Sequence, residues 1–305
     1  MKNIIVIAGA TASGKTSLAI RLAKALSGEV VSADSMQVYK NMDIGTAKPD
    51  CDEMDNVPHH MLSVADPTDS YSTKDFVEGA KKAIEDIISR GKLPIVAGGT
   101  GMYLDVLTGR MDFDAPASDP KIREELMALY ETEGLDALYE VFLREAGEYE
   151  GKIHKNDVKR IMRAIERARS GFKKDDKTTE NEYNSIWFAI DIDRDKLYNR
   201  IDKRVDIMLE KGLIDEVRRV IEPVRDKCTT SLQGIGYKEV LMYFDGQVSY
   251  DEMAEIIKKR SRNYAKRQLT WFRRNNDIHW LNADNAFSEA IDIIHMKGDL
   301  HENSN

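Results

Sequence analysis

Short apolar runs alternate with amphipathic stretches along the first hundred residues of the chain. Apolar runs bounded by glycine or polar residues predict buried strands, and they lie at residues 3–10, 29–35, 59–66 and 92–101. Residues 15–27 and 72–91 have the spacing of apolar positions that is typical of amphipathic helices. This alternation predicts an α/β fold in which a parallel sheet carries helices on both faces.

The pattern becomes mainly helical after residue 109. Helical spacing recurs in three stretches, residues 117–134, 135–147 and 156–171. The first stretch begins with Asp119 and Pro120, which favour the start of a helix. Residues 172–184 are polar and predict a loop. We therefore expect an all-helical insertion at residues 115–184, within a core made of residues 1–114 and 185–305.

The second part of this core returns to a mixed pattern. An apolar run at residues 185–194 predicts a strand, and residues 194–212 and 250–274 have helical spacing. A last apolar run at residues 278–283 predicts a strand that completes the sheet.

Composition sets broad limits on the class of protein. Of 305 residues, 42% are hydrophobic and 32% are charged, as in ordinary soluble domains. The first eight residues are too short for a signal peptide, and the apolar runs are too short to cross a membrane. Cys51 and Cys228 form no C-x-x-C pair. We expect a cytoplasmic monomer without membrane contact.

Charge is distributed unevenly along the chain, although the net charge of −8 argues weakly against nucleic-acid binding. Residues 152–174 hold nine Lys or Arg and two acids, and residues 258–274 hold eight Lys or Arg and no acid. The two segments are either solvated helix faces or a positive surface for a polyanion, and charge alone favours neither.

The first chemical motif follows the first predicted strand. Residues 9–16 read G-x-x-x-x-G-K-T, a loop whose backbone N–H groups bind phosphate at the start of a helix. Lys15 adds a point charge, and the Thr16 hydroxyl is placed to bind Mg²⁺. The candidate phosphate ligands are Gly9, Ala10, Thr11, Ala12, Ser13, Gly14, Lys15 and Thr16. The motif predicts a P-loop NTPase-like core.

The carboxylate that normally accompanies this loop is missing from its usual strand. The strand at residues 92–101 ends in Gly-Gly-Thr-Gly, whereas Asp34 ends the strand that follows the phosphate-loop helix. Carboxyl ends of parallel strands meet at one edge, so Asp34 and Thr100 should both face the phosphates. Asp34 is then a metal ligand, a general base or a turn residue. A bound diphosphate could serve as a leaving group.

Seven blocks between residue 4 and about residue 280 together resemble the tRNA dimethylallyltransferase family, the bacterial tRNA isopentenyltransferases. They read GATASGKT, SADSMQVYKNMDIGTAKP, VPHHMLSVADP, VAGGTGMYL, NDVKRIMRAIE, GIGYKE and YAKRQLTWFRR. The resemblance implies transfer of a dimethylallyl group from dimethylallyl diphosphate to N6 of adenosine 37, in tRNAs that read codons beginning with U. It also implies that the helical insertion binds the anticodon stem-loop. The phosphate-loop threonine, Thr16, leads us to expect Mg²⁺ as the cofactor.

The resemblance also assigns roles to individual residues. The phosphate loop, Gly9 to Thr16, would bind the diphosphate, and Asp34 would take the proton from the adenine amine. Thr100 would lie at the reaction centre, and Lys15 and Arg204 near the diphosphate. The implied tRNA contacts are Asp34, Ser35, Met36, Gln37, Thr100, Arg123, Lys159, Arg160, Ile161, Met162, Arg163, Gln233, Gly234, Ile235, Gly236, Tyr237 and Lys238.

Three other functions are compatible with a phosphate loop. An adenylate isopentenyltransferase would share the core and its chemistry, but a free nucleotide needs no basic helical insertion. A small-molecule kinase would turn over ATP and would use Asp34 as its metal carboxylate. A non-catalytic RNA-binding protein would leave Lys15 and Asp34 without a role.

Overall fold

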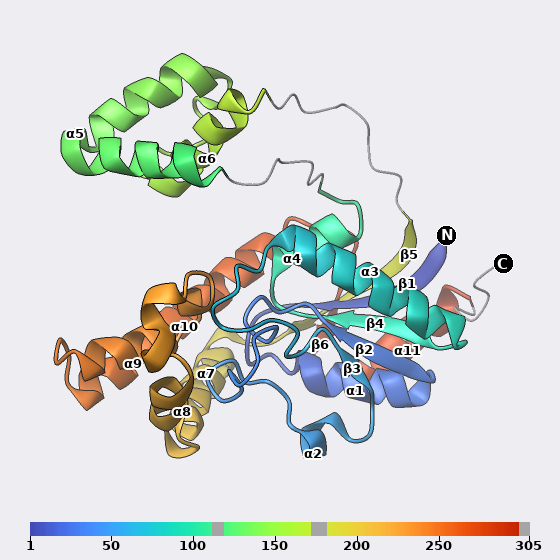
Figure 1. Cartoon of the computed structure of the whole chain (residues 1–305). Coiled ribbons are helices and arrows are strands. Elements are labelled where there is room, and N and C mark those ends of the chain that lie inside the picture. The colour runs from blue at the N-terminus through green and yellow to red at the C-terminus, as the bar shows by residue number, and fades with distance from the viewer. Residues whose placement is uncertain (112–118, 172–181, 299–305) are drawn as a thin grey trace. The chain divides into compact units, whose positions relative to one another are not determined.

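The computed structural model describes residues 1–111, 119–171 and 182–298, and the chain divides into two compact units (Figure 1). Unit 1 contains Met1–Met111 and Glu180–Asn305, and unit 2 contains Asp112–Thr179. The expected boundary after residue 114 lies outside the described residues. The expected return to the core at residue 185 is too late, because Tyr183 and Asn184 already pair with β1 as part of a strand.

Six parallel strands form the sheet of unit 1, in the order β3-β2-β4-β1-β5-β6. Their bounds are Lys2–Ala8 (β1), Gly28–Ser32 (β2), His59–His60 (β3), Leu93–Ala97 (β4), Tyr183–Asp191 (β5) and Ile278–Asn282 (β6). The parallel sheet is confirmed. The strand expected at residues 59–66 is only two residues long, because Met61 and Ser63 adopt left-handed backbone angles, with φ of 64° and 54°.

Helices cover both faces of this sheet (Figure 1). In β1, Ile5 and Ile7 pack with α1 (Lys15–Ala25) and α11 (Ala286–Met296). Ile4 and Val6 point the other way and pack with α3 (Thr73–Ser89) and α4 (Gly101–Leu107). Alternation along a strand therefore divides the core into two layers, as the apolar pattern predicts.

Unit 1 also contains a group of four helices after β5, and the sequence predicts only two of them. The four helices are α7 (Arg194–Glu210), α8 (Leu213–Val220), α9 (Tyr237–Phe244) and α10 (Tyr250–Phe272). The spacing predicts α7 and α10 but neither α8 nor α9, which are only eight residues each. These helices share a third apolar cluster with Val38, Tyr39 and Met42. The segment after β2 that contains Val38, Tyr39 and Met42 therefore packs against these helices and not against the sheet.

Unit 2 is helical, as expected, and has its own apolar core. It contains α5 (Pro120–Ala146), which breaks at Gly134 with φ of 86°, and α6 (Val158–Arg169). Asp119 caps α5 by accepting a hydrogen bond from the Lys121 N–H at 2.9 Å. Leu138, Phe142 and Ile161 are fully buried between the helices. In the described parts of both units, the search for a helix long and apolar enough to span a membrane finds none.

Candidate active site

The phosphate loop joins β1 to α1 through backbone conformations with positive φ. Gly9, Ala12 and Gly14 have φ of 137°, 62° and 106°, in or near the left-handed region. Gly14 is the N-cap of α1 and makes no side-chain cap, so the first N–H groups of α1 can bind an anion. Ala12 packs on Leu197 and the rest of a small apolar cluster that also includes residues of α10. The loop is therefore held in its anion-binding shape before any ligand arrives.

Two cations lie beside this loop. Lys15 Nζ donates to the Ala10 carbonyl at 2.6 Å, and Arg204 Nη1 lies 3.5 Å from Thr11 Oγ1. Burial and the nearby Arg204 guanidinium lower the pKa of Lys15 to about 8, and the Asp34 carboxylate acts in the opposite direction. Burial also lowers the pKa of Arg204. Two desolvated cations near one carboxylate make a strong site for a polyanion.

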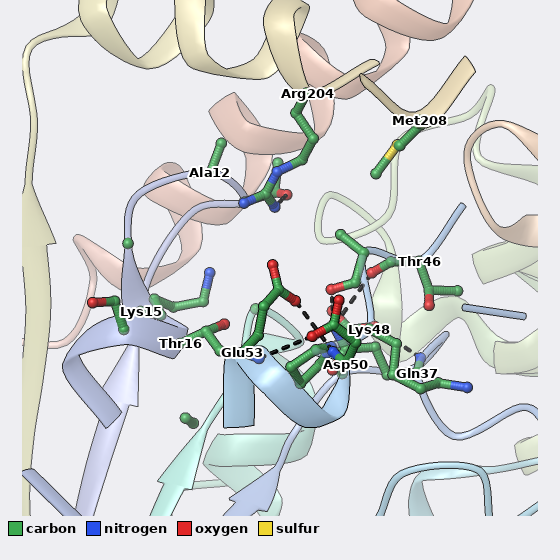
Figure 2. Close-up of a pocket in the computed structure, with 18 of the residues that line it drawn as sticks. Ala12, Lys15, Thr16, Gln37, Thr46, Lys48, Asp50, Glu53, Arg204 and Met208 are labelled. Atoms are coloured by element: carbon green, nitrogen blue, oxygen red, sulfur yellow. Dashed lines mark hydrogen bonds between the residues drawn. The ribbon is translucent and has the colours of Figure 1, made fainter. Parts of the chain in front are cut away.

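The loop opens into a cleft of about 890 Å³, within the usual range for small-molecule sites. Figure 2 shows Arg204 reaching from α7 towards the loop, with Lys15 and Thr16 on one side of the space. Asp50 and Glu53 face them from the short helix α2 (Cys51–Met54), where they form a reciprocal cap. The cleft therefore has a cationic wall at the phosphate loop and an acidic wall opposite.

Asp34 and Thr100 lie at the same edge of the sheet, as the parallel strand order predicts. Asp34 Oδ1 accepts from the N–H groups of Met36 and Gln37 at 2.9 and 3.3 Å. Thr100 Oγ1 accepts from the Ser35 N–H at 3.0 Å. Asp34 therefore does shape a turn, and the same turn places its carboxylate in the wall of the cleft.

Two side chains of α10 complete this edge, and neither is among the site residues that the sequence predicts. Gln268 is buried; its Oε1 accepts from the Thr11 N–H at 2.8 Å and its Nε2 donates to the Gly99 carbonyl at 2.9 Å. A Cβ at Gly99 would lie 2.1 Å from Gln268 Nε2, so the glycine leaves the space that the Gln268 amide occupies. Tyr264 shares a hydrogen bond with Thr100, and burial raises its pKa. The sequence block YAKRQLTWFRR indicates that α10 belongs to the site, but only the fold shows which of its side chains face the cleft.

A second cavity of about 330 Å³ adjoins the cleft and shares Asp34, Arg204 and Tyr264 with it. It brings together two sequence blocks expected to contact tRNA; its lining includes Ser35, Met36, Gln233, Gly234, Ile235 and Tyr237. Gln37 lines the main cleft. Gly236 lies at the start of α9 and Lys238 is exposed. The cavity also has an apolar side formed by Ile201, Val205, Met208 and Ile257.

In unit 2, Arg123 and Arg163 come from different helices and meet at one carboxylate. Glu166 is 2% exposed; its Oε1 accepts from Arg123 Nε at 2.9 Å and its Oε2 from Arg163 Nη1 at 3.0 Å. Glu166 was not among the expected site residues. It explains how an arginine of α5 and one of α6 are held in a fixed arrangement.

The remaining members of the unit 2 block differ in exposure. Lys159 and Arg160 are exposed, whereas Ile161 and Met162 are buried in the helical core. The expectation of direct contacts from the Ile161 and Met162 side chains is therefore not supported, because an α-helix with one buried face presents only its other face. Any contact from this block falls to the basic residues.

The oxygen atoms near the phosphate loop fit a magnesium ion that is bound mainly by the phosphates of a substrate. Thr16 is exposed at the loop and lines the cleft, as does Asp34. Among the described residues, no group of three or more His, Cys, Asp or Glu side chains could hold a metal. Mg²⁺ commonly uses one or two protein oxygens together with substrate phosphates and water, which is what this site offers.

Comparison with known proteins identifies related sequences over the whole chain. Residues 37–275 match the family described as IPP transferase, and residues 2–66 match one described as isopentenyl transferase. A tRNA dimethylallyltransferase of Acetivibrio thermocellus is 44% identical over 303 residues, which cover 97% of each chain. Another, from Bacillus cytotoxicus, is 42% identical over 310 residues and covers 100% of this chain and 98% of the relative.

Solved structures are similar over the same extent. The full-length tRNA isopentenylpyrophosphate transferase of Bacillus halodurans has a TM-score of 0.73 at 40% identity, and covers 99% of this chain and 98% of its own. A eukaryotic dimethylallyltransferase acting on tRNA has a TM-score of 0.81 at 31% identity, and covers 100% of this chain and 81% of its own. The similarity includes the helical unit as well as the sheet.

Proposed function

This chain belongs to the IPP transferase family of tRNA dimethylallyltransferases and is a prenyltransferase, and we propose that its donor is dimethylallyl diphosphate. The acceptor is N6 of adenosine 37 in tRNAs that read codons beginning with U. A bond forms between N6 and the allylic carbon, the bond from that carbon to the diphosphate oxygen breaks, and N6 loses a proton. The products are N6-isopentenyladenosine and diphosphate.

The phosphate loop stabilises the leaving group. Lys15 and Arg204 lie close together beside it, and the N–H groups at the start of α1 point into the same space. Negative charge develops on the diphosphate as the carbon–oxygen bond breaks, so preorganised donors lower the barrier. Mg²⁺ held by Thr16 and the phosphate oxygens would neutralise part of the same charge.

Asp34 acts on the acceptor. The amine of adenine is a weak nucleophile because its lone pair is delocalised into the ring, so removal of a proton assists attack. General-base help of this kind is typically worth about 10²- to 10⁴-fold in rate. The backbone N–H groups of Met36 and Gln37 both donate to Asp34 Oδ1, so we assign proton removal to Oδ2. Thr100 supports the turn by accepting from the Ser35 N–H.

One observation supports this proposal most strongly. Asp34 lines the cleft together with the phosphate loop, and it also lines the adjoining cavity formed by residues of the Gln233–Lys238 block. Adenine must leave the anticodon-loop stack to reach it, which costs a few kcal/mol and least in a loop. Phosphate contacts from unit 2 offset that cost. We also propose that the protein is a monomer and that it acts on its tRNA in the cytoplasm.

The basic helical unit favours tRNA over a free adenine nucleotide as the acceptor. Arg123, Arg160 and Arg163 lie on that unit, and a mononucleotide in the cleft of unit 1 would have no use for them. The alternative of a kinase predicts consumption of ATP.

One assay separates these functions. Purified protein with Mg²⁺, tRNA and radiolabelled dimethylallyl diphosphate should produce labelled tRNA when no other nucleotide is present. Parallel reactions contain AMP in place of tRNA, or ATP in addition to it. Labelled AMP at a rate equal to that of tRNA would favour an adenylate isopentenyltransferase, and an absolute requirement for ATP would favour a kinase.

A further inference from the structure

The segment Asp43–Ala47 lines both cavities, yet it belongs to no helix or strand. Its backbone is held by one side chain that lies far away in the sequence, Glu216 of α8. Glu216 Oε2 accepts from the Asp43 N–H at 2.9 Å and the Ile44 N–H at 2.7 Å. Glu216 Oε1 accepts from the Gly45 N–H at 3.0 Å and the Tyr237 hydroxyl at 2.7 Å.

This arrangement requires a carboxylate. Glu216 is 2% exposed, and burying a charged group is costly unless donors surround it. Three consecutive backbone N–H groups converge on it in the manner of an anion-binding nest, and the tyrosine adds a fourth donor. A glutamine would turn one NH₂ group towards these donors, so an amide of the same size cannot make the same set of bonds.

Tyr237 fixes the same segment by packing as well as by its hydroxyl. A Cβ on Gly45 would lie 2.7 Å from the Tyr237 ring, so the Gly45 backbone rests directly against that ring. Tyr237 is fully buried at the start of α9. Tyr237, which was expected to contact tRNA, thus lines the second cavity and also fixes the position of the Gly45 backbone.

The ordered segment then contacts the turn that carries Asp34. Gln37 Nε2 donates to the carbonyls of Thr46 and Ala47 at 3.3 and 3.1 Å. The backbone N–H of Gln37 donates to Asp34 Oδ1. A continuous series of hydrogen bonds thus leads from Glu216, through the segment and Gln37, to the carboxylate proposed as the base.

We infer that Glu216 is a positioning residue for the acceptor side of the reaction. It sets the shape of Asp43–Ala47 and, through Gln37, the orientation of Asp34. None of its hydrogen bonds goes to the phosphate loop, so it acts on the acceptor and leaves diphosphate binding alone. This inference rests on the function proposed above.

The test is Glu216→Gln, with Glu29→Gln as the matched control. Glu29 is also a buried carboxylate, but it binds Arg90 and His60 at the opposite end of β2 from Asp34. For Glu216→Gln, kcat/KM for tRNA should fall about 10²-fold, the usual effect of misplacing a reacting group by about 1 Å. The Kd for inorganic pyrophosphate with Mg²⁺ should stay within about twofold of wild type. Glu29→Gln should lower Tm without this selective kinetic loss.

A second variant and a double-mutant cycle address folding and the route of the effect. Tyr237→Phe removes the hydroxyl that donates to Glu216 and keeps the ring, and should cause a smaller loss with the same selectivity. Glu216→Gln combined with Gln37→Met should lose less than the product of the single losses, because both act on one chain of contacts.

The outcomes are distinct. A wild-type protein that does not modify tRNA would contradict the proposed function. An active wild type whose Glu216→Gln variant loses pyrophosphate affinity as much as activity, or matches the Glu29→Gln control in kinetics, would overturn the positioning role. If the loss in the double variant equals the product of the losses in Glu216→Gln and Gln37→Met, the effect of Glu216 does not pass through Gln37.

Discussion

The two sides of the cleft are built in different ways. The phosphate side is made from consecutive residues at the end of β1, with Gly9, Gly14 and Lys15 in one loop. The acceptor side is assembled from the turn after β2, the segment at residues 43–47, and α8, α9 and α10, joined by Glu216 and Tyr237. The phosphate side is mainly local, with Arg204 and Gln268 added from α7 and α10, whereas the acceptor side depends throughout on tertiary contacts. Substitutions on the two sides should therefore change different kinetic constants.

The largest expected effect is at Asp34. Asp34→Asn keeps the size of the side chain and removes its basicity, so kcat should fall roughly 10²- to 10⁴-fold if this residue is the base. Because Met36 and Gln37 donate to Oδ1, an Asn oxygen can preserve the turn. The affinity for dimethylallyl diphosphate should change little. Single-turnover rates and diphosphate affinity are measured over a range of Mg²⁺ concentrations.

The same titration decides between a base and a metal ligand. Near-complete rescue by Mg²⁺, with weakened diphosphate binding, would make Asp34 a metal ligand and move it to the phosphate side. A wild-type rate at every Mg²⁺ concentration would remove it from the mechanism.

Gln268 connects the two sides of the cleft, so its substitution should change the kinetic constants of both. It accepts from Thr11 in the phosphate loop and donates to Gly99, beside Thr100. Gln268→Met would leave both backbone groups unsatisfied, at about 1–3 kcal/mol each. We expect about 10-fold losses in both diphosphate affinity and kcat, with a lower Tm. A loss confined to either constant would show that Gln268 serves only that side.

The sequence predicted the local side far better than the assembled one. The spacing of Gly9, Gly14 and Lys15 is itself the phosphate loop, and the strand order alone places Asp34 beside Thr100. Glu216 and Glu166 look like ordinary charged residues on amphipathic helices, and only folding shows that each is buried against partners from other elements. Tyr183 lies in a polar stretch that predicts a loop, but the structure places it in β5 because it pairs with β1.

The next effect concerns pH and tests the phosphate side. The pKa of Lys15 is lowered to about 8, so in the free protein its ammonium loses its proton as the pH rises above 8. The bound diphosphate favours the charged form, and its affinity should fall by up to about tenfold per pH unit between pH 8 and 9.5. Calorimetry in buffers of different ionisation enthalpy should show proton uptake on binding in that range.

Lys15→Arg is the control, because a guanidinium stays protonated throughout. Its diphosphate affinity should be independent of pH above 8, whatever its absolute value. The affinity of tRNA for either protein should not follow this profile, since the lysine lies on the phosphate side. An unchanged diphosphate affinity in the wild type up to pH 9.5 would contradict a pKa near 8 in the binding site.

The smallest effect separates RNA binding from both sides of the cleft. Lys159 and Arg160 are exposed on α6, whereas Arg163 and Arg123 share the buried Glu166, so the first pair is the cleaner choice for substitution. In Lys159→Ala with Arg160→Ala, each lost phosphate contact should reduce the slope of log affinity against log salt by about one. The control is Lys74→Ala with Lys82→Ala on α3, two lysines that lie in unit 1 and line neither cavity. Pyrophosphate affinity and the rate with saturating tRNA should be unchanged in both variants. If the tRNA affinity of the α6 variant follows that of the control at every salt concentration, then α6 is a solvated face and the charge of this unit does not bind the acceptor.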